Sequence, residues 1–260
     1  SSLLGTQFVN MALPLTAAIV LDASPIQMGV VTAMTGAPAF LGIFIGAWID
    51  RRPRLPILIG SDLGRAALLA LIPISYFLDI LSIWLIYVVA FGLGLFTMAF
   101  SIGYRAFLPT VVAKSELVEA NSKLELAGSG TSAVGPAAAG ALVQAVNAPF
   151  AIIFGVFNYV ISALLFRWIR VTEHAPKDAS GNGTENAGGI AAGIRVFRRN
   201  STLVAIAGSQ ATLVLFSAGF MSIGLLYKVR DLEITPWLLG GILSAGSIGS
   251  LFGAIVATKI

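Results

Sequence analysis

Long uninterrupted apolar stretches dominate this sequence, and they limit its possible folds more than any other feature. Eight of them are about 20 residues long, which is the length that an α-helix needs to cross the hydrocarbon core of a bilayer. They cover residues 3–21, 27–49, 57–77, 82–103, 126–146, 149–168, 202–226 and 237–257. Only 11% of all residues are charged, against roughly 25% in ordinary soluble domains. The sequence therefore predicts an all-α, polytopic bundle of transmembrane helices.

A polar linker separates the sixth apolar stretch from the seventh. Residues 172–189 are rich in Gly, Ser, Asn and charged side chains, which is typical of a connecting segment. Residues 190–199 place apolar side chains on one helical face and arginines on the other, which predicts a short amphipathic helix. We therefore divide the chain into a six-helix unit at 1–171, a linker at 172–200 and the start of a second transmembrane unit at 201–260.

Two short segments of the first unit recur in the second unit. Gly5-Thr6-Gln7 is echoed by Gly208-Ser209-Gln210, and residues 42–47 are echoed by residues 249–254, in the same order. We therefore expect the second unit to be a copy of the first that stops after two helices, so that the chain is a fragment lacking the last four spans. No Met and no basic segment precede the first apolar stretch, so we expect the start to be missing as well.

Successive spans place the loops alternately on the two sides of the membrane, and basic residues are distributed unevenly between these sides. If the loop at 51–54 is cytoplasmic, 14 of the 16 Lys and Arg residues fall on that side, and only Lys228 and Arg230 fall on the other. This bias follows the positive-inside rule and predicts a multi-pass protein whose linker is cytoplasmic. Because the charges lie in short runs between apolar stretches, the net charge of +4 does not indicate nucleic-acid binding.

Several kinds of chemical site have no sequence pattern here. The chain has no cysteine, and its one histidine, His174, lies beside the linker without partner ligands. No Gly-rich phosphate loop with a following Lys occurs, and no Ser, His and Asp triad can be assembled. We therefore predict no metal site, no cofactor and no enzymatic activity.

The strongest local pattern lies in the turn between the second and third apolar stretches, where residues 46–54 read GAWIDRRPR. Gly46 would let a neighbouring helix approach closely. Asp50 can pair with Arg51 or Arg54 at the membrane edge, or lie at the N-terminus of a facing helix. Such a cluster can hold one conformation and release it in another, whereas the plainer interpretation is an ordinary basic loop.

Asp62 and Arg65 are three residues apart in the third apolar stretch, and a helix places them on one face. They lie one to two turns inside the predicted span, where ionisable side chains are costly unless paired and are functional candidates. The alternative is a self-neutralising pair near the lipid headgroups.

The fifth apolar stretch contains the small-residue segment 135–140, which reads GPAAAG. Pro136 removes a backbone donor and kinks a helix, and Gly135 and Gly140 permit tight packing against a partner helix. The alternative is a tightly packed helix with no directional meaning.

These features together resemble the major facilitator superfamily. Residues 46–54 resemble its motif A, although Pro53 stands where the motif has a second Gly, and residues 135–140 resemble its motif C, the Gly-Pro signature of exporters. With Leu108-Pro109 and the polar segment 116–122, they are similar to the enterobactin-exporter and macrolide-efflux branch. The resemblance implies a major facilitator fold and secondary active export of drugs or siderophores from a bacterium across its inner membrane, by alternating access and coupled to the proton gradient.

The resemblance also implies a central substrate cavity lined partly by spans one, four and seven. Gln7, Asn10 and Gln210 are the polar side chains available there, and each could bond either to a small-molecule substrate or to another helix. Few acids lie near the membrane interior for proton coupling: Asp62 near one edge and Asp22 near the other. A lipid or lysophospholipid flippase, or a sensor with the same fold, is the alternative function.

Overall fold

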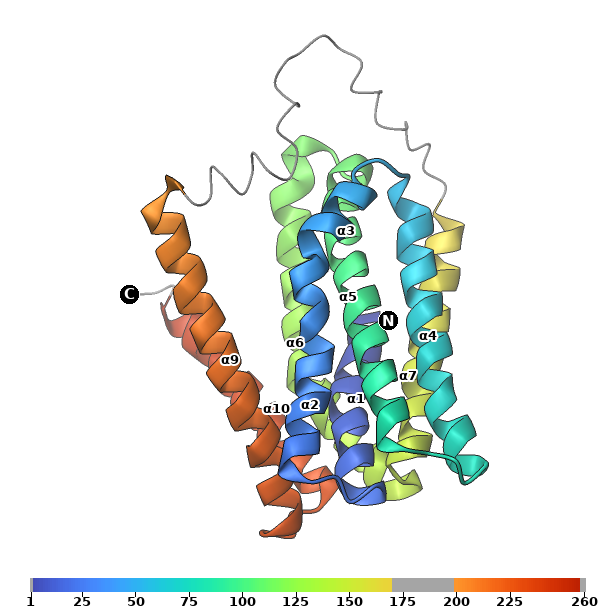
Figure 1. The fold of residues 1–260 in the computed structure, drawn as a ribbon. Helices are drawn as coiled ribbons and strands as arrows, with labels where there is room; N and C mark the ends of the chain where they lie inside the picture. The colour runs from blue at the N-terminus through green and yellow to red at the C-terminus, as the bar shows by residue number, and fades with distance from the viewer. Residues whose placement is uncertain (1, 170–198, 258–260) are drawn as a thin grey trace.

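A computed structural model describes residues 2–169 and 199–257 of the chain, and every element in these ranges is helical (Figure 1). The elements are α1 (Ser2–Leu15), the π-helical turn η1 (Thr16–Val20), α2 (Pro25–Gly36), the 3₁₀ turn η2 (Ala37–Leu41), α3 (Gly42–Ile49), α4 (Arg54–Phe77), α5 (Ile83–Val111), the 3₁₀ turn η3 (Lys114–Glu116), α6 (Leu117–Val146), α7 (Ala148–Trp168), α9 (Ser201–Arg230) and α10 (Pro236–Ala257). The predicted all-α bundle is confirmed.

Five of the described helical segments are long and apolar enough to cross a membrane. They are Ser2–Val20, Arg54–Phe77, Ile83–Val111, Ala148–Trp168 and Val204–Arg230. The other three predicted spans are also helical, within α2 to α3, α6 and α10. The amphipathic helix expected at 190–199 falls almost wholly outside the described residues.

The predicted second span is not one regular helix. Ser24 and Gln27 form a capping box at its start: the Gln27 backbone N–H donates to the Ser24 hydroxyl at 3.3 Å, and the Ser24 N–H donates to the Gln27 amide oxygen at 2.7 Å. Further along, η2 separates α2 from α3 at Pro38, because proline lacks the N–H that would continue the α-helical pattern.

The polar segment between the fourth and fifth predicted spans is mostly helical, which the hydropathy pattern did not indicate. α5 continues to Val111 and α6 begins at Leu117, with only a short break and η3 between them. Polar residues such as Arg105, Glu119 and Lys123 are compatible with a helix that extends out of the bilayer. The apolar limits of a span therefore underestimate the lengths of these two helices.

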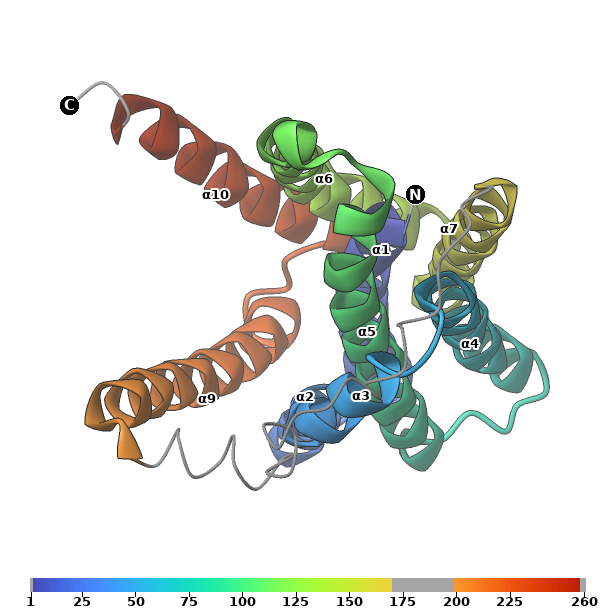
Figure 2. The ribbon, with the colours of Figure 1, turned by 90° about the horizontal axis from the view of Figure 1, so that it is seen from above.

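The first six spans pack around one apolar core. α4 lies against both α5 and α7, while α1 lies against α6 and α7, and α2 lies against α5 (Figure 2). Fully buried side chains from four helices meet in this core, including Leu15, Leu69, Ile86 and Ile152. Outward-facing residues such as Phe77, Trp84 and Phe157 are exposed, as expected where the surrounding solvent is lipid.

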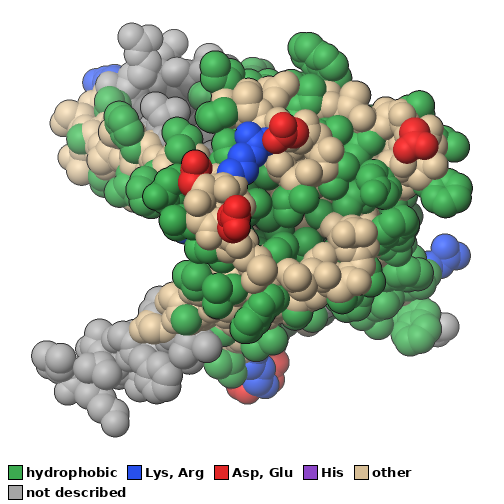
Figure 3. Space-filling model, turned by 90° about the horizontal axis from the view of Figure 1, so that it is seen from below, with side chains coloured by type: hydrophobic (Ala, Val, Ile, Leu, Met, Phe, Trp, Pro, Cys, Tyr) green, Lys and Arg blue, Asp and Glu red, His purple; other side chains and the backbone are tan. Residues whose placement is uncertain are grey.

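The last two helices meet the first six at one end of the bundle only. We call the end that carries Trp168 and Ser201 the linker end, and the other the opposite end. Described side chains of α9 from Ser201 to Ser217 are exposed, whereas Leu226 and Leu239 near the opposite end are buried. α9 accordingly diverges from α2 toward the linker end (Figures 1 and 2). Seen from the opposite end, the surface is largely hydrophobic and carries few charged side chains (Figure 3).

Candidate functional site

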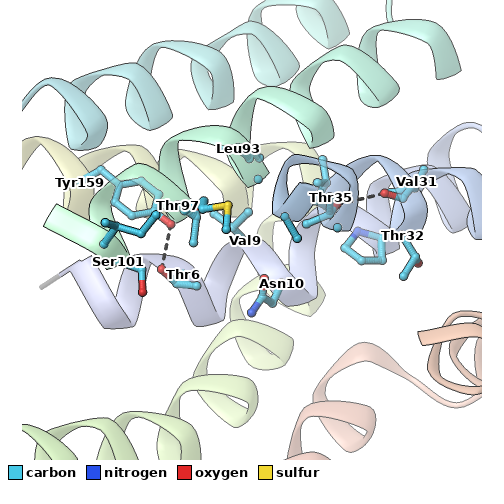
Figure 4. Close-up of a pocket in the computed structure, with 17 residues that line it drawn as sticks. Thr6, Val9, Asn10, Val31, Thr32, Thr35, Leu93, Thr97, Ser101 and Tyr159 are labelled. Carbon is cyan, nitrogen blue, oxygen red and sulfur yellow. Dashed lines mark hydrogen bonds between the residues drawn. The ribbon is translucent and has the colours of Figure 1, made fainter. Parts of the chain in front are cut away.

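A cavity of about 500 Å³ lies among α1, α2, η2 and α5, and Tyr159 of α7 forms part of its wall (Figure 4). Its polar lining is made of hydroxyl and amide side chains: Thr6, Asn10, Thr32, Thr35, Thr97, Ser101 and Tyr159. Apolar side chains such as Val9 and Leu93 provide most of the remaining wall. None of the described lining residues carries a charge. The size falls in the range typical of sites for drug-sized ligands.

The irregular part of the second span forms one wall of this cavity. Thr35, Gly36 and Ala39 line the cavity where α2 gives way to η2. α5 approaches closely there, because a Cβ added to Gly94 would lie 2.2 Å from the backbone oxygen of Thr35. Gly94 therefore permits a contact that places Thr97 and Ser101 opposite α2.

A buried ion pair lies behind Tyr159. The Arg65 guanidinium donates to the Asp62 carboxylate, and the Ser2 hydroxyl joins both, at 3.2 Å from Asp62 Oδ1 and 3.1 Å from Arg65 Nη2. The guanidinium carbon lies 4.4 Å from the centre of the Phe100 ring and 4.3 Å from that of Tyr159. Asp62 is 0% exposed and Arg65 is 1% exposed. The two residues do share one helical face, and they lie in the bundle interior rather than at an exposed edge.

Tyr159 connects this pair to the cavity. Its ring covers Arg65, while its hydroxyl lies 3.0 Å from the Thr6 hydroxyl, and both Tyr159 and Thr6 line the cavity. The tyrosine therefore separates a charged interior from an uncharged cavity. Sequence reasoning missed this residue, because the side chains it joins come from helices far apart in the chain.

The three amides expected at a central cavity have different surroundings. Asn10 lines the cavity. Gln7 instead donates from Nε2 to the Ser132 hydroxyl of α6 at 3.0 Å, and Gly135 makes room for its side chain. Gln210 is exposed on α9, away from the described lining. Only Asn10 is thus placed to contact a ligand in this conformation.

The turn at 46–54 lies exposed at the linker end. The Asp50 backbone N–H donates to the Gly46 carbonyl at 2.9 Å, and the Arg52 guanidinium lies 4.8 Å from the centre of the Trp48 ring. Asp50 makes no ion pair among the residues that the structure describes. The expected close helix approach at Gly46 is also absent, because no described atom lies within 4 Å of the position of an added Cβ. Ile49 of the same turn is nevertheless buried, so the open space lies on the Gly46 side of the turn.

The Gly-Pro segment of α6 packs directly on α10. A Cβ added to Gly140 would lie 2.2 Å from the Pro236 carbonyl oxygen, and one added to Gly240 would lie 2.2 Å from the Pro136 carbonyl oxygen. The Ala137 N–H donates to the Ser244 hydroxyl of α10 at 3.0 Å. The expected tight packing against a partner helix is therefore present, and that helix belongs to the second half of the chain.

A second ion pair joins the two halves at the opposite end. Arg230, at the end of α9, pairs with Asp22 between η1 and α2, and also donates to the Ala18 carbonyl at 3.4 Å. Sequence reasoning did not pair these residues. The pairing could have been inferred from the sequence, because Arg230 is one of only two basic residues predicted on the side opposite the linker. Asp22 is expected on the same side.

The comparisons with known proteins identify the family. Neither the comparison with curated proteins nor that with solved structures gives a match. The sequence does match the family described as Major Facilitator Superfamily over residues 1–260. Members of this family transport small-molecule substrates across membranes and are generally not enzymes. The chain therefore belongs to the major facilitator superfamily and is a multi-pass membrane protein of the transporter class.

Proposed function

We propose that this protein is a secondary active exporter of small amphipathic molecules, working by alternating access in a bacterial inner membrane. The observation that carries the proposal is the contact pattern of the two halves. They meet at the end opposite the linker, through the Asp22 and Arg230 pair and the packing of α6 on α10, and they diverge at the linker end. In alternating access the two halves rock against each other. One state of such a transporter has a cavity and an opening between the halves at one end only.

The distribution of basic residues supports an orientation with the linker end in the cytoplasm. In that orientation the described conformation is open inward, and the cavity can receive a molecule from the cytoplasm. The Gly-Pro segment at 135–140 resembles the exporter signature, and its contact with α10 lies between the halves that must rock. Drugs or siderophores are the substrates that the resemblance to the enterobactin-exporter and macrolide-efflux branch suggests.

Protons are the proposed coupling ion. Asp62 is the buried carboxylate nearest to the cavity wall, since its partner Arg65 lies under the Tyr159 ring. Asp22 lies at the contact between the halves. Both positions would link a change in protonation to a change in packing.

The cluster at Asp50, Arg51 and Arg54 is proposed to stabilise the outward-open state. When the linker end closes, a helix of the other half would approach Gly46 and Asp50. The absence of an ion pair at Asp50 among the described residues fits an inward-open state in which this contact is released.

A lipid-handling alternative has less support. A groove of about 440 Å³ opens between α4 and α7 near Phe77 and Phe150, and all its described lining residues are apolar. Such a groove could hold an acyl chain but offers nothing that would recognise a polar headgroup. The uncharged, hydroxyl-lined cavity is therefore the better candidate for a transported molecule.

Efflux measurements test the proposal. Cells that express the protein would be loaded with the uncharged dye Nile red or with a catecholate siderophore, and efflux followed with and without a protonophore, for the natural sequence and Asp50→Asn. We expect both perturbations to abolish efflux. Full activity with the protonophore would reject proton coupling, full activity of Asp50→Asn would reject the role of Asp50, and no movement of either compound would reject export of this class.

A further inference from the structure

We propose that the cavity among α1, α2 and α5 selects an uncharged amphipathic molecule by its hydrogen-bond donors, in particular its hydroxyl groups. This inference deepens the proposed function and rests on it, because it names the substrate class of the same cavity. Three observations carry it: fixed acceptors on α1, α2 and α7, adaptable hydroxyls on α5, and no charge in the described lining.

The threonines of α2 present acceptors. The Thr32 hydroxyl donates to the Met28 carbonyl at 3.2 Å. The Thr35 hydroxyl donates to the Val31 carbonyl at 3.0 Å (Figure 4). A hydroxyl has a single proton to donate and two lone pairs that accept. Both threonine hydroxyls therefore already donate their proton to the helix backbone. Each can only accept a hydrogen bond from a ligand.

Tyr159 is an acceptor for the same reason. The Thr6 hydroxyl donates its proton to the Ser2 carbonyl at 3.0 Å, so the Tyr159 hydroxyl must be the donor in its 3.0 Å bond to Thr6. The lone pairs of the Tyr159 oxygen remain available at the cavity wall. Three helices thus contribute hydroxyl oxygens whose protons are already committed.

The facing wall is adaptable. Thr97 and Ser101 are four residues apart on α5, so their side chains lie on one face. No hydrogen bond holds either hydroxyl among the described residues, so each can donate or accept. Together with the Asn10 amide, they can complete the bonds of a hydroxyl that donates to α2.

The electrostatics exclude a strong preference for ions. No described residue of the lining is charged, and the Tyr159 ring lies between Arg65 and the cavity. Transfer of an ion from water into an apolar wall without an opposite charge is strongly unfavourable. Lys228 lines an adjoining pocket of about 210 Å³ that shares Asn10 with the cavity, and it disfavours cations further.

Binding of a matched pair of probes to the purified protein tests the inference. Catechin is an uncharged polyphenol with several hydroxyl donors, and its fully O-methylated ether keeps the ring skeleton and the oxygen atoms but has no donors. Isothermal titration should give at least about tenfold tighter binding of catechin, since several hydrogen bonds are lost in the ether. Tetraphenylphosphonium and anilinonaphthalene sulfonate serve as a cationic and an anionic probe, and both should bind more weakly than catechin.

Variants of Thr35 assign the effect to the cavity. Thr35→Val removes the acceptor at nearly constant volume and should weaken catechin binding roughly fivefold, whereas Thr35→Ser retains the oxygen and should bind normally. Thr131→Val is the matched control, because Thr131 makes the same kind of bond to its own helix, to the Ala127 carbonyl at 2.7 Å, outside the cavity.

The inference is overturned if catechin does not bind, if catechin and its ether bind equally, or if either charged probe binds more tightly. Tighter binding of the sulfonate would assign recognition to Lys228 instead. Efflux of Nile red or of the siderophore without donor-dependent binding would reject this inference and leave the proposed function standing. Donor-dependent binding without efflux of any compound would support this inference and reject the proposed function.

Discussion

The ring of Tyr159 covers the guanidinium of Arg65, with the guanidinium carbon 4.3 Å from the ring centre. One face of the tyrosine therefore stabilises a buried cation, while its hydroxyl lies at the wall of a cavity large enough for a drug-sized molecule. A ligand that displaces this tyrosine must also disturb the environment of the Asp62 and Arg65 pair. The cavity and the charged interior are in this way physically adjacent.

Removal of one charge from the buried pair should destabilise the protein. Asp62→Asn leaves the Arg65 guanidinium buried without a counter-charge, and the expected loss is roughly 3–5 kcal/mol of unfolding free energy. The double variant Asp62→Asn with Arg65→Met should be more stable than Asp62→Asn alone. Unfolding in mixed detergent micelles measures both.

The exposed pair of Glu119 and Lys123, 2.8 Å apart on α6, provides the control for this experiment. Glu119→Gln should change stability little, because both side chains are largely in water. Equal effects of Asp62→Asn and Glu119→Gln would contradict the buried position of Asp62.

The contact of α6 with α10 should not tolerate a methyl group. In Gly140→Ala the added carbon meets the Pro236 carbonyl, which is backbone and cannot rotate away, so the helices must separate. We expect a loss of roughly 1–3 kcal/mol in stability and reduced efflux. Gly130→Ala on the same helix has no described atom within 4 Å of the added carbon, and it should behave like the natural protein. Normal stability of Gly140→Ala would show that the two halves are not packed in this way.

The two roles of Tyr159 can be separated by substitution. Tyr159→Phe keeps the ring over Arg65 but loses the hydroxyl, so catechin binding should weaken while stability falls by only about 1 kcal/mol. Tyr159→Leu removes the ring as well, and the lost cation–π contact should lower stability by roughly a further 2 kcal/mol. Titration and thermal unfolding of both variants provide the readouts. Equal stability of the Phe and Leu variants would show that the ring does not stabilise Arg65.

The ion pair between the halves should bias the conformational equilibrium. Arg230 is 32% exposed and Asp22 is 91% exposed, so the pair contributes at most about 1 kcal/mol. Asp22→Asn should therefore raise the population open at the opposite end by roughly two- to fivefold, without unfolding the protein. Glu119→Gln should leave the populations unchanged, because Lys123 lies in the same half.

Sequence reasoning predicted the helices well because the bilayer dictates their length and composition. All eight apolar stretches are helical in the described residues, and the match to the superfamily confirms the resemblance at that level. The break of the second span at Pro38 and the extension of α5 to Val111 were not predicted. The break depends on local backbone geometry, and the extension depends on polar residues that favour a helix. A search for apolar stretches detects neither feature.

The site was predicted less completely, because side-chain partners come from distant parts of the chain. Gln7 and Asn10 are alike in sequence context, yet Gln7 bonds to Ser132, which is 125 positions away, and Asn10 lines the cavity. Asp22 and Arg230 are 208 positions apart. The pairing of Asp62 with Arg65 was predicted, since a helix alone brings residues three apart together.

Distances measured in a membrane test alternating access most directly. The chain has no cysteine, so spin labels can be attached at chosen pairs of introduced cysteines. Val118 with Thr202 reports on the linker end, and Ile26 with Leu232 reports on the opposite end; all four side chains are exposed. Pulsed electron spin resonance on the protein in lipid vesicles gives the distance distribution of each pair.

We predict a majority population with a long distance at the linker end and a short distance at the opposite end. In Asp22→Asn a second population should grow in which the linker-end distance shortens as the opposite-end distance lengthens. A single unchanging distance at both ends, in the natural protein, in Asp22→Asn and in the presence of catechin, would contradict alternating access.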